Sequence, residues 1–180
     1  REHGSTLSFL LINEMRQLEK LRIGLKARPL FPLDVIDLNL VLPPPMLRNL
    51  RLYGKLEKFS EWISEFQNLV ELRLKYSHLA DDPIKCIENM QNLLSLSIID
   101  NAYEGESLHF HDGVLQNLKE LYIRGLPNLN TIVFDKGALH SLKKIELSHI
   151  PNLARVPFNI YYLQKLEVVN VKDVCRYNID

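Results

Sequence analysis

The chain has almost no cysteine and no acceptor for N-linked glycosylation. It contains two cysteines, Cys86 and Cys175, far apart in the sequence, and no Asn-x-Ser/Thr triplet. Extracellular repeat proteins commonly carry disulfide pairs and such triplets, because they fold in an oxidising compartment. Both absences therefore favour a protein that works in the cytoplasm.

The chain also lacks a long apolar run and a net charge. The longest apolar candidate, Phe9–Ile12, is far shorter than the roughly 20 residues that a membrane-spanning helix needs, so we expect no membrane span. Lysine plus arginine equals aspartate plus glutamate, 22 of each, so bulk charge predicts no nucleic-acid partner. The chain begins at Arg1 without a methionine or a signal-peptide pattern, and we expect it to be a piece of a longer protein.

One short pattern recurs along almost the whole chain: an aliphatic residue, two free positions, a second aliphatic, one free position and a third aliphatic. The first positions of its copies are 22 to 29 residues apart. This period and pattern are those of a leucine-rich repeat, so the sequence predicts an α/β leucine-rich-repeat solenoid of about seven repeats. The copies are Leu18/Leu21/Ile23, Leu47/Leu50/Leu52, Leu69/Leu72/Leu74, Leu93/Leu96/Ile98, Leu118/Leu121/Ile123, Leu142/Ile145/Leu147 and Leu166/Val169/Val171.

The spacing within each copy predicts how the repeats are arranged. The last two aliphatic residues are two positions apart, so on a strand they face the same side. A single strand buries too few side chains to offset the ordering of its backbone, so the repeats must stack around a common core. We expect a curved solenoid with a parallel sheet on its concave side and short helical or irregular returns on its convex side. We assign residues 1–180 to a single domain, with 1–17 as the end of a preceding repeat, 18–174 as the seven repeats and 175–180 as a tail.

The return segments carry a second regularity. Apolar residues three positions apart over 63–69 and 87–93 indicate 3₁₀ turns or short helices. Asp82 followed by Pro83 predicts a helix start. The position that usually holds a ladder-forming asparagine is Asn in one repeat alone, at Asn101. We therefore expect degenerate repeats and uneven curvature.

The repeat register identifies the side chains on the concave face. Eight of them are basic and three are acidic, an excess of five positive charges in a neutral chain. Like charges in neighbouring rows repel each other, so we expect a protein partner with an acidic surface. A merely solvated face is the alternative. The candidate protein-binding residues are Lys20, Arg22, Arg51, Tyr53, Arg73, Lys75, Tyr122 and Arg124.

Other reactive side chains carry weaker signals. His109 and His111 share one face of a segment expected to be extended, but no Cys or Glu cluster lies beside them in the sequence. We therefore expect a solvated loop and no metal site. Cys86 lies between apolar neighbours and is expected to be a small buried hydrophobe. The spacing shows no catalytic triad or paired carboxylates, so we expect no catalytic residue, no cofactor and no enzymatic activity.

Two blocks of sequence are more specific than the general repeat: Pro43–Leu47 through Tyr53–Leu56 with Trp62-Ile63, and Asn101–Phe110. Through them, residues 43–172 resemble the C-terminal repeat region of plant intracellular disease-resistance receptors of the coiled-coil, nucleotide-binding, leucine-rich-repeat (NLR) class. The chain has no Gly-x4-Gly-Lys-Ser/Thr phosphate loop, so nucleotide binding is not carried over to it. The resemblance implies a role in plant defence, in recognising a pathogen effector, in autoinhibition, or in both.

The resemblance also implies three kinds of partner: the nucleotide-binding domain of the same receptor, a pathogen effector, or a guarded host protein. Two alternatives belong to other classes. A free-standing signalling scaffold would have more regular repeats, and the substrate-recruiting adaptor of a ubiquitin ligase would need an F-box helix bundle. The sequence shows neither feature, so we interpret the chain as a non-enzymatic interaction module of an immune receptor.

Overall fold

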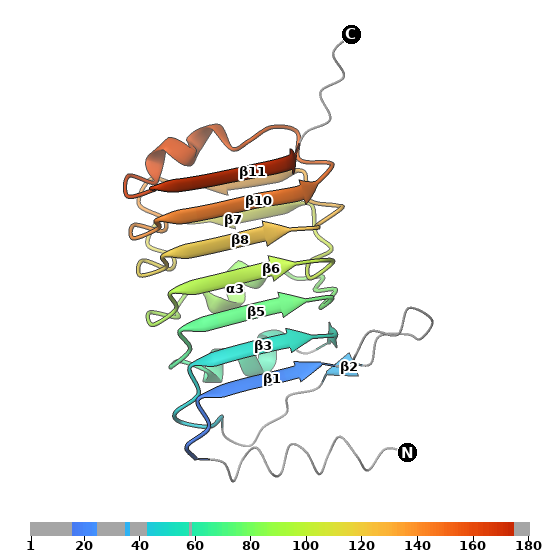
Figure 1. Ribbon diagram of the computed structural model, residues 1–180, viewed down its shortest axis with the longest axis vertical. Helices are drawn as coiled ribbons and strands as arrows, with labels where there is room; N and C mark the ends of the chain where they lie inside the picture. Colours follow the sequence, from blue (N-terminus) through green and yellow to red (C-terminus); the bar gives the residue numbers. More distant parts are fainter. Residues whose placement is uncertain (1–15, 25–34, 37–42, 58, 175–180) are drawn as a thin grey trace.

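One large parallel sheet dominates the structure, a computed structural model that describes residues 16–24, 35–36, 43–57 and 59–174. Its seven strands follow the order β1-β3-β5-β6-β8-β10-β11, and Figure 1 shows them climbing from β1 to β11 in steps of one repeat. This arrangement confirms the predicted α/β leucine-rich-repeat solenoid. The strands are β1 (Lys20–Gly24), β3 (Asn49–Tyr53), β5 (Glu71–Lys75), β6 (Ser95–Ile99), β8 (Glu120–Arg124), β10 (Lys144–Ile150) and β11 (Val168–Val174).

The strands pair at equivalent positions of successive repeats, so the register read from the sequence is confirmed. Leu72, for example, lies between Leu50 and Leu96. The last two aliphatic residues of each interior copy point into one continuous core and are fully buried. At roughly 1.5–3 kcal/mol for each fully buried aliphatic side chain, this shared core is the main source of stability. These residues are Leu50, Leu52, Leu72, Leu74, Leu96, Ile98, Leu121, Ile123, Ile145 and Leu147.

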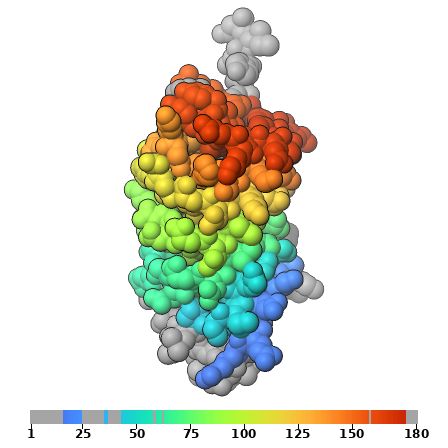
Figure 2. All heavy atoms as spheres, turned by 90° about the vertical axis from the view of Figure 1, so that its left-hand side faces the viewer, coloured from blue at the N-terminus to red at the C-terminus, as the bar shows by residue number. Residues whose placement is uncertain are grey.

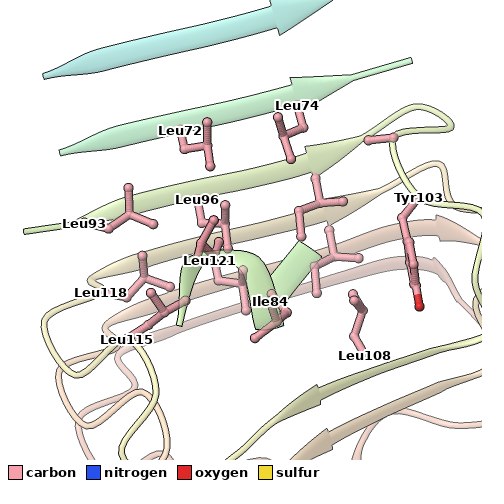
Figure 3. Close-up of a cluster of buried hydrophobic side chains, with 14 of the residues drawn as sticks. Leu72, Leu74, Ile84, Leu93, Leu96, Tyr103, Leu108, Leu115, Leu118 and Leu121 are labelled. Carbon is pink, nitrogen blue, oxygen red and sulfur yellow. The ribbon is translucent and has the colours of Figure 1, made fainter. Parts of the chain in front are cut away.

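The convex side is built from short helices and two small parallel sheets. Helix α2 (Phe59–Trp62), the 3₁₀ helices η1 (Ile63–Glu65) and η2 (Phe158–Tyr162), and α3 (Pro83–Ile87) lie in the returns. Strand β2 (Val35–Ile36) pairs with β4 (Lys55–Leu56), and β7 (Ser107–Phe110) pairs with β9 (Thr131–Phe134). Figure 3 shows Leu72, Leu96 and Leu121 pointing from the large sheet toward Ile84 of α3 and Leu108 of β7.

The returns form as their sequence predicts. The backbone N–H of Phe66 donates to the carbonyl of Ile63, and that of Leu69 donates to the carbonyl of Phe66. These i→i+3 bonds are 3₁₀ turns, and they put every third residue against the core. At the start of α3, Asp82 Oδ1 accepts a hydrogen bond from the N–H of Ile84 at 2.9 Å, which confirms the predicted N-cap.

Asparagine ladders are present, but at positions that the sequence analysis did not consider. Just before the strands, each asparagine amide donates to a backbone carbonyl of the preceding repeat. The bonds run from Asn68 to Pro45, from Asn92 to Gln67 and from Asn117 to Gln91, at 2.9 to 3.1 Å. On the opposite edge, Asn128 bonds Glu104 and Asn152 bonds Pro127. Each bond contributes about 0.5–1.5 kcal/mol, and together they join neighbouring repeats.

The expected preceding repeat and tail lie outside the described residues, apart from Arg16 and Gln17, and so does Cys175. Cys86 is half-buried and packs against the core, and burial raises the pKa of its thiol. A thiol held protonated in this way is a packing group rather than a nucleophile.

Candidate protein-interaction surface

The residues predicted to face the partner all lie on the open, concave face of the large sheet. In β3 and β5, inward leucines alternate with outward side chains that are half-exposed. Register places Arg22 beside Arg51, and Arg51 beside Arg73, in one row across three strands. Neighbouring strands are about 4.8 Å apart, so these three guanidinium side chains are close neighbours.

Arg51 is neutralised within the sheet. Its Nε donates to Glu71 Oε1 at 2.8 Å, and the amide of Asn49 donates to Glu71 Oε2 at 2.7 Å. Burial alone would raise the pKa of Glu71, but the hydrogen bonds from Arg51 and Asn49 outweigh it and the pKa lies below its ordinary value. Glu71 therefore stays ionised and holds Arg51 in place.

Asp100 pairs with two more of the candidate cations and offsets one of their two charges. Its Oδ2 lies 2.8 Å from Lys75 Nζ and 3.1 Å from Arg124 Nη2, and its side chain is 22% exposed. Burial by itself would raise the pKa of Asp100, but the hydrogen bonds from Lys75 and Arg124 are stronger and lower it. Asp100 was not predicted from the sequence, because it lies one position beyond the strand, outside the positions that the repeat register assigns to the concave face.

Close packing around Asp100 depends on Gly125. The residue has φ +63°, and a Cβ there would lie 2.8 Å from Asp100 Oδ1 and 3.2 Å from its Cα. Glycine adopts this backbone conformation without strain and leaves room for the carboxylate. The ion pairs of Asp100 thus rest on a backbone position from the next repeat.

Aromatic rings occupy both flanks of the basic row. The guanidinium of Arg22 lies over the ring of Tyr53, 4.6 Å from its centroid. The Tyr122 hydroxyl donates to Glu120 Oε2 at 3.0 Å, and Lys144 Nζ lies 3.3 Å from the Tyr122 oxygen. The two tyrosines are thus held in fixed positions with part of each ring exposed.

Arg73, like Arg22, makes no direct ion pair within the described part of the chain, although its charge helps to lower the pKa of Glu71. Its Nε is buried and has no hydrogen-bond partner there. An unsatisfied buried donor costs about 1–3 kcal/mol, more when the group is charged. Arg73 is therefore a half-buried cation of this face that has no ion-pair partner among the described residues.

The concave face is less basic and less open than the sequence indicated. Adding Asp100 to the counted residues reduces the excess from five positive charges to four. Ser97, Ile99 and Ser148 occupy outward positions of their strands but are buried. Ser97, for example, is short beside its neighbours Arg73 and Tyr122. Arg51, Lys75 and Arg124 make ion pairs with acids of the same chain, so their mutual repulsion is smaller than the sequence indicated.

A second concave surface lies where the strands begin, the side that faces the viewer in Figure 2. It is a shallow groove of about 640 Å³ that runs across several repeats. The asparagine ladder forms part of its wall, so its polar groups are largely occupied in joining repeats. It is lined by Pro45, Met46, Arg48, Asn68, Val70, Gln91, Asn92, Leu94, Asn117, Lys119 and Ser141.

Potential metal ligands gather on the other side of the molecule. Within the described residues, His109, His111 and Asp135 form one group whose ligand atoms all lie within 4.8 Å of one another. His109 lies in β7 and not in the expected solvated loop. Asp135 comes from the next repeat, so inspection of the sequence around the histidines did not find it.

The fold and the concave face of the large sheet define a leucine-rich-repeat interaction module, and comparison with known families agrees. Residues 5–179 match the model of the family described as a leucine-rich repeat region, and the chain belongs to that family. It is 35% identical over 137 residues to the disease resistance protein RPM1 of Arabidopsis thaliana. That stretch is 75% of this chain and 14% of RPM1, so the chain spans a small part of its relative. The resemblance to plant NLR disease-resistance proteins is thereby confirmed.

No helix among the described residues is both long enough and apolar enough to cross a membrane.

Proposed function

We propose that this chain is the non-enzymatic interaction region of a plant intracellular immune receptor, and that it docks an acidic protein surface on its concave face in the cytoplasm. The similarity to RPM1 supports the immune role. The leucine-rich-repeat family supports protein binding as the activity. The observation that supports the docking site is Arg73, on the third of the seven strands, which has no ion-pair partner among the described residues.

The chemistry of the face selects the partner. A carboxylate over Arg73 would pair with its guanidinium group through the strong, charge-assisted type of hydrogen bond. Tyr53 and Tyr122 offer rigid, amphipathic contact area on either flank, and Arg and Tyr are the residues most enriched at binding hot spots. The remaining excess of positive charge steers an acidic partner toward the face.

Three partners fit this description: the nucleotide-binding domain of the same receptor, a pathogen effector, and a guarded host protein. Docking of the nucleotide-binding domain corresponds to autoinhibition, and docking of the other two corresponds to recognition. The autoinhibitory contact is the form that we put forward, because a partner tethered in the same chain has a high effective concentration and binds through a modest surface.

The test is a charge reversal at Arg73 in the complete receptor. Arg73→Glu reverses this charge, breaks no direct ion pair among the described residues and lies outside the hydrophobic core. Lys165→Glu, at the exposed turn before β11, is the control with the same change of charge. We expect Arg73→Glu to cause a defence response without a pathogen when expressed in leaves, while Lys165→Glu stays silent. Normal resting and pathogen-induced behaviour of Arg73→Glu would contradict docking at this site.

A further inference from the structure

The small sheet on the convex side brings together three metal-ligating groups from two repeats. Along β7, the buried Leu108 and Phe110 alternate with outward positions, so His109 points away from the core. The following outward position is His111. Phe110 stacks on Phe134 of β9 with ring centroids 5.2 Å apart, and this buried contact fixes the register of the two strands. The same register places Asp135, which follows β9, beside His111.

The three side chains already converge. His109 Nε2 lies 2.8 Å from Asp135 Oδ1, and His111 Nδ1 lies 3.5 Å from Asp135 Oδ2. The two imidazole rings are 3.8 Å apart between centroids. In a tetrahedral zinc site with bonds of about 2.0–2.1 Å, ligand atoms are roughly 3.3 Å apart. All the ligand atoms here lie within 4.8 Å of one another, so the group is compact enough to contact one ion.

The surroundings favour a cation and orient the carboxylate. The backbone of Asp112 hydrogen-bonds the carboxylate of Asp135. Asp82, at the start of α3, lies close enough to interact electrostatically with both histidines. A ligand held by a backbone group, in a locally acidic environment, is the usual supporting arrangement of a protein metal site.

We propose that His109, His111 and Asp135 bind one divalent first-row transition-metal ion of the Zn²⁺ type. Two imidazole nitrogens and one carboxylate oxygen suit Zn²⁺, and they do not suit Ca²⁺ or Mg²⁺, which take oxygen ligands. Three protein ligands leave a coordination position for water. Because the ligands belong to two repeats, the bound ion ties the β7 repeat to the β9 repeat and stabilises the folded chain.

Other histidine–carboxylate pairs among the described residues resemble the proposed site but lack its second histidine. His78 Nδ1 lies 2.8 Å from Glu104 Oε1, and His149 Nε2 lies 3.2 Å from Asp173 Oδ2, each across one repeat. These pairs have the same histidine–carboxylate chemistry as the proposed site, with two ligand groups in place of three. They are internal controls for a simple ion pair.

The experiment is a titration of the metal-free 180-residue chain with Zn²⁺ by calorimetry, and with Co²⁺ by its visible absorption. We expect one ion per chain, a Co²⁺ spectrum that reports nitrogen and oxygen ligands, and a rise in thermal midpoint with Zn²⁺. Asp135→Asn and His109→Gln should each weaken Zn²⁺ binding at least tenfold, whereas His78→Gln and His149→Gln should leave it unchanged.

Circular dichroism of each variant checks that it is folded, and His111→Gln provides a second test of the same site. Failure of the parent chain to bind one Zn²⁺ would overturn the proposal. Unchanged binding in folded Asp135→Asn and His109→Gln would do the same, because the ion would then lie elsewhere. An equal loss in His78→Gln would show only non-specific binding to surface histidines, which also contradicts the site.

Discussion

Strands β6 and β11 carry the same repeat pattern but have opposite environments. In β6, at the centre of the sheet, Leu96 and Ile98 are fully buried between β5 and β8. In β11, at the edge of the described sheet, the equivalent Val169 and Val171 are 48% and 41% exposed. The pattern therefore fixes which side of the strand an aliphatic residue faces. Burial requires a neighbour on each side.

The charged residues show the same difference. Asp100 follows β6 and Asp173 occupies the equivalent position in β11, with nearly identical φ angles of 49° and 52°. Asp100 binds two cations and is 22% exposed, whereas Asp173 pairs with His149 and is 57% exposed. The equivalent backbone position thus carries a half-buried pairing with Lys75 and Arg124 at the centre and an exposed pairing with a histidine at the edge, where solvent screens the interaction more strongly.

The largest expected effect comes from placing a charge at equivalent positions of β6 and β11. Ile98→Asp buries an unpaired carboxylate and should destabilise the fold by more than about 4 kcal/mol, enough to unfold the central repeats. Val171→Asp should cost less than about 1 kcal/mol, because its side chain stays in water. Denaturant unfolding followed by circular dichroism measures both. Equal losses of unfolding free energy would show that the side chain of Val171 is shielded from water.

Next in size is the pair of aspartates. Asp100→Asn removes the charge that holds Lys75 and Arg124 and should cost about 1.5–3 kcal/mol, the range for hydrogen bonds to charged groups. Asp173→Asn, in an exposed pair, should cost about 0–1 kcal/mol. Unfolding free energies at neutral pH provide the comparison. If Asp100→Asn is as mild as its counterpart, the central ion pairs add little to stability.

A smaller difference separates two glycines with positive φ. Gly125→Ala suffers backbone strain and also displaces the carboxylate of Asp100, whereas Gly113→Ala suffers the strain alone, since nothing lies within 4 Å of its Cβ. Both should lose about 1–2 kcal/mol from the backbone, and Gly125→Ala should lose up to about 1.5 kcal/mol more. In a chain that already carries Asp100→Asn, Gly125→Ala should lose no more stability than Gly113→Ala, because the ion pairs of Asp100 are already gone. If the two losses of stability simply add in the double variant, Gly125 and Asp100 do not depend on each other.

The smallest expected effect is a change in acid sensitivity. The pKa of Asp100 is lower in the folded chain than in the unfolded chain, where it is about 3.9. Its contribution is therefore fully present above about pH 4–5 and is lost as pH falls through the folded pKa. The difference in unfolding free energy between the parent chain and Asp100→Asn should narrow over that range. A constant difference down to pH 2 would show that the charge is not responsible.

The sequence predicted the periodic part of this structure well, because the core depends on local alternation. Leu72 and Leu74 face inward, Arg73 faces outward, and the Asp82-Pro83 helix start is as expected. The same reasoning located the basic row Arg22, Arg51 and Arg73 in register. These features need only the repeat length and the side to which each residue points.

Contacts between repeats were harder to predict, because they involve residues about 24 positions apart. The bonds from Asp100 to Lys75 and Arg124, and the approach of Asp135 to the two histidines, cross from one repeat to the next. A search for charged residues one repeat away would have found Asp135, which is 24 positions after His111. The burial of Ser97 depends on the size of its neighbours, which periodicity does not describe.

The proposed docking of an acidic partner on Arg73 is tested most directly by measuring the salt dependence of binding. The probe is the purified nucleotide-binding domain of the receptor, immobilised and bound by the 180-residue chain at roughly 50 and 300 mM salt, where the screening length falls from about 14 to 6 Å. We expect salt to weaken binding, Arg73→Glu to weaken it at least about tenfold, and Lys165→Glu to leave it nearly unchanged. Affinity that responds neither to salt nor to Arg73→Glu would contradict docking on the concave face.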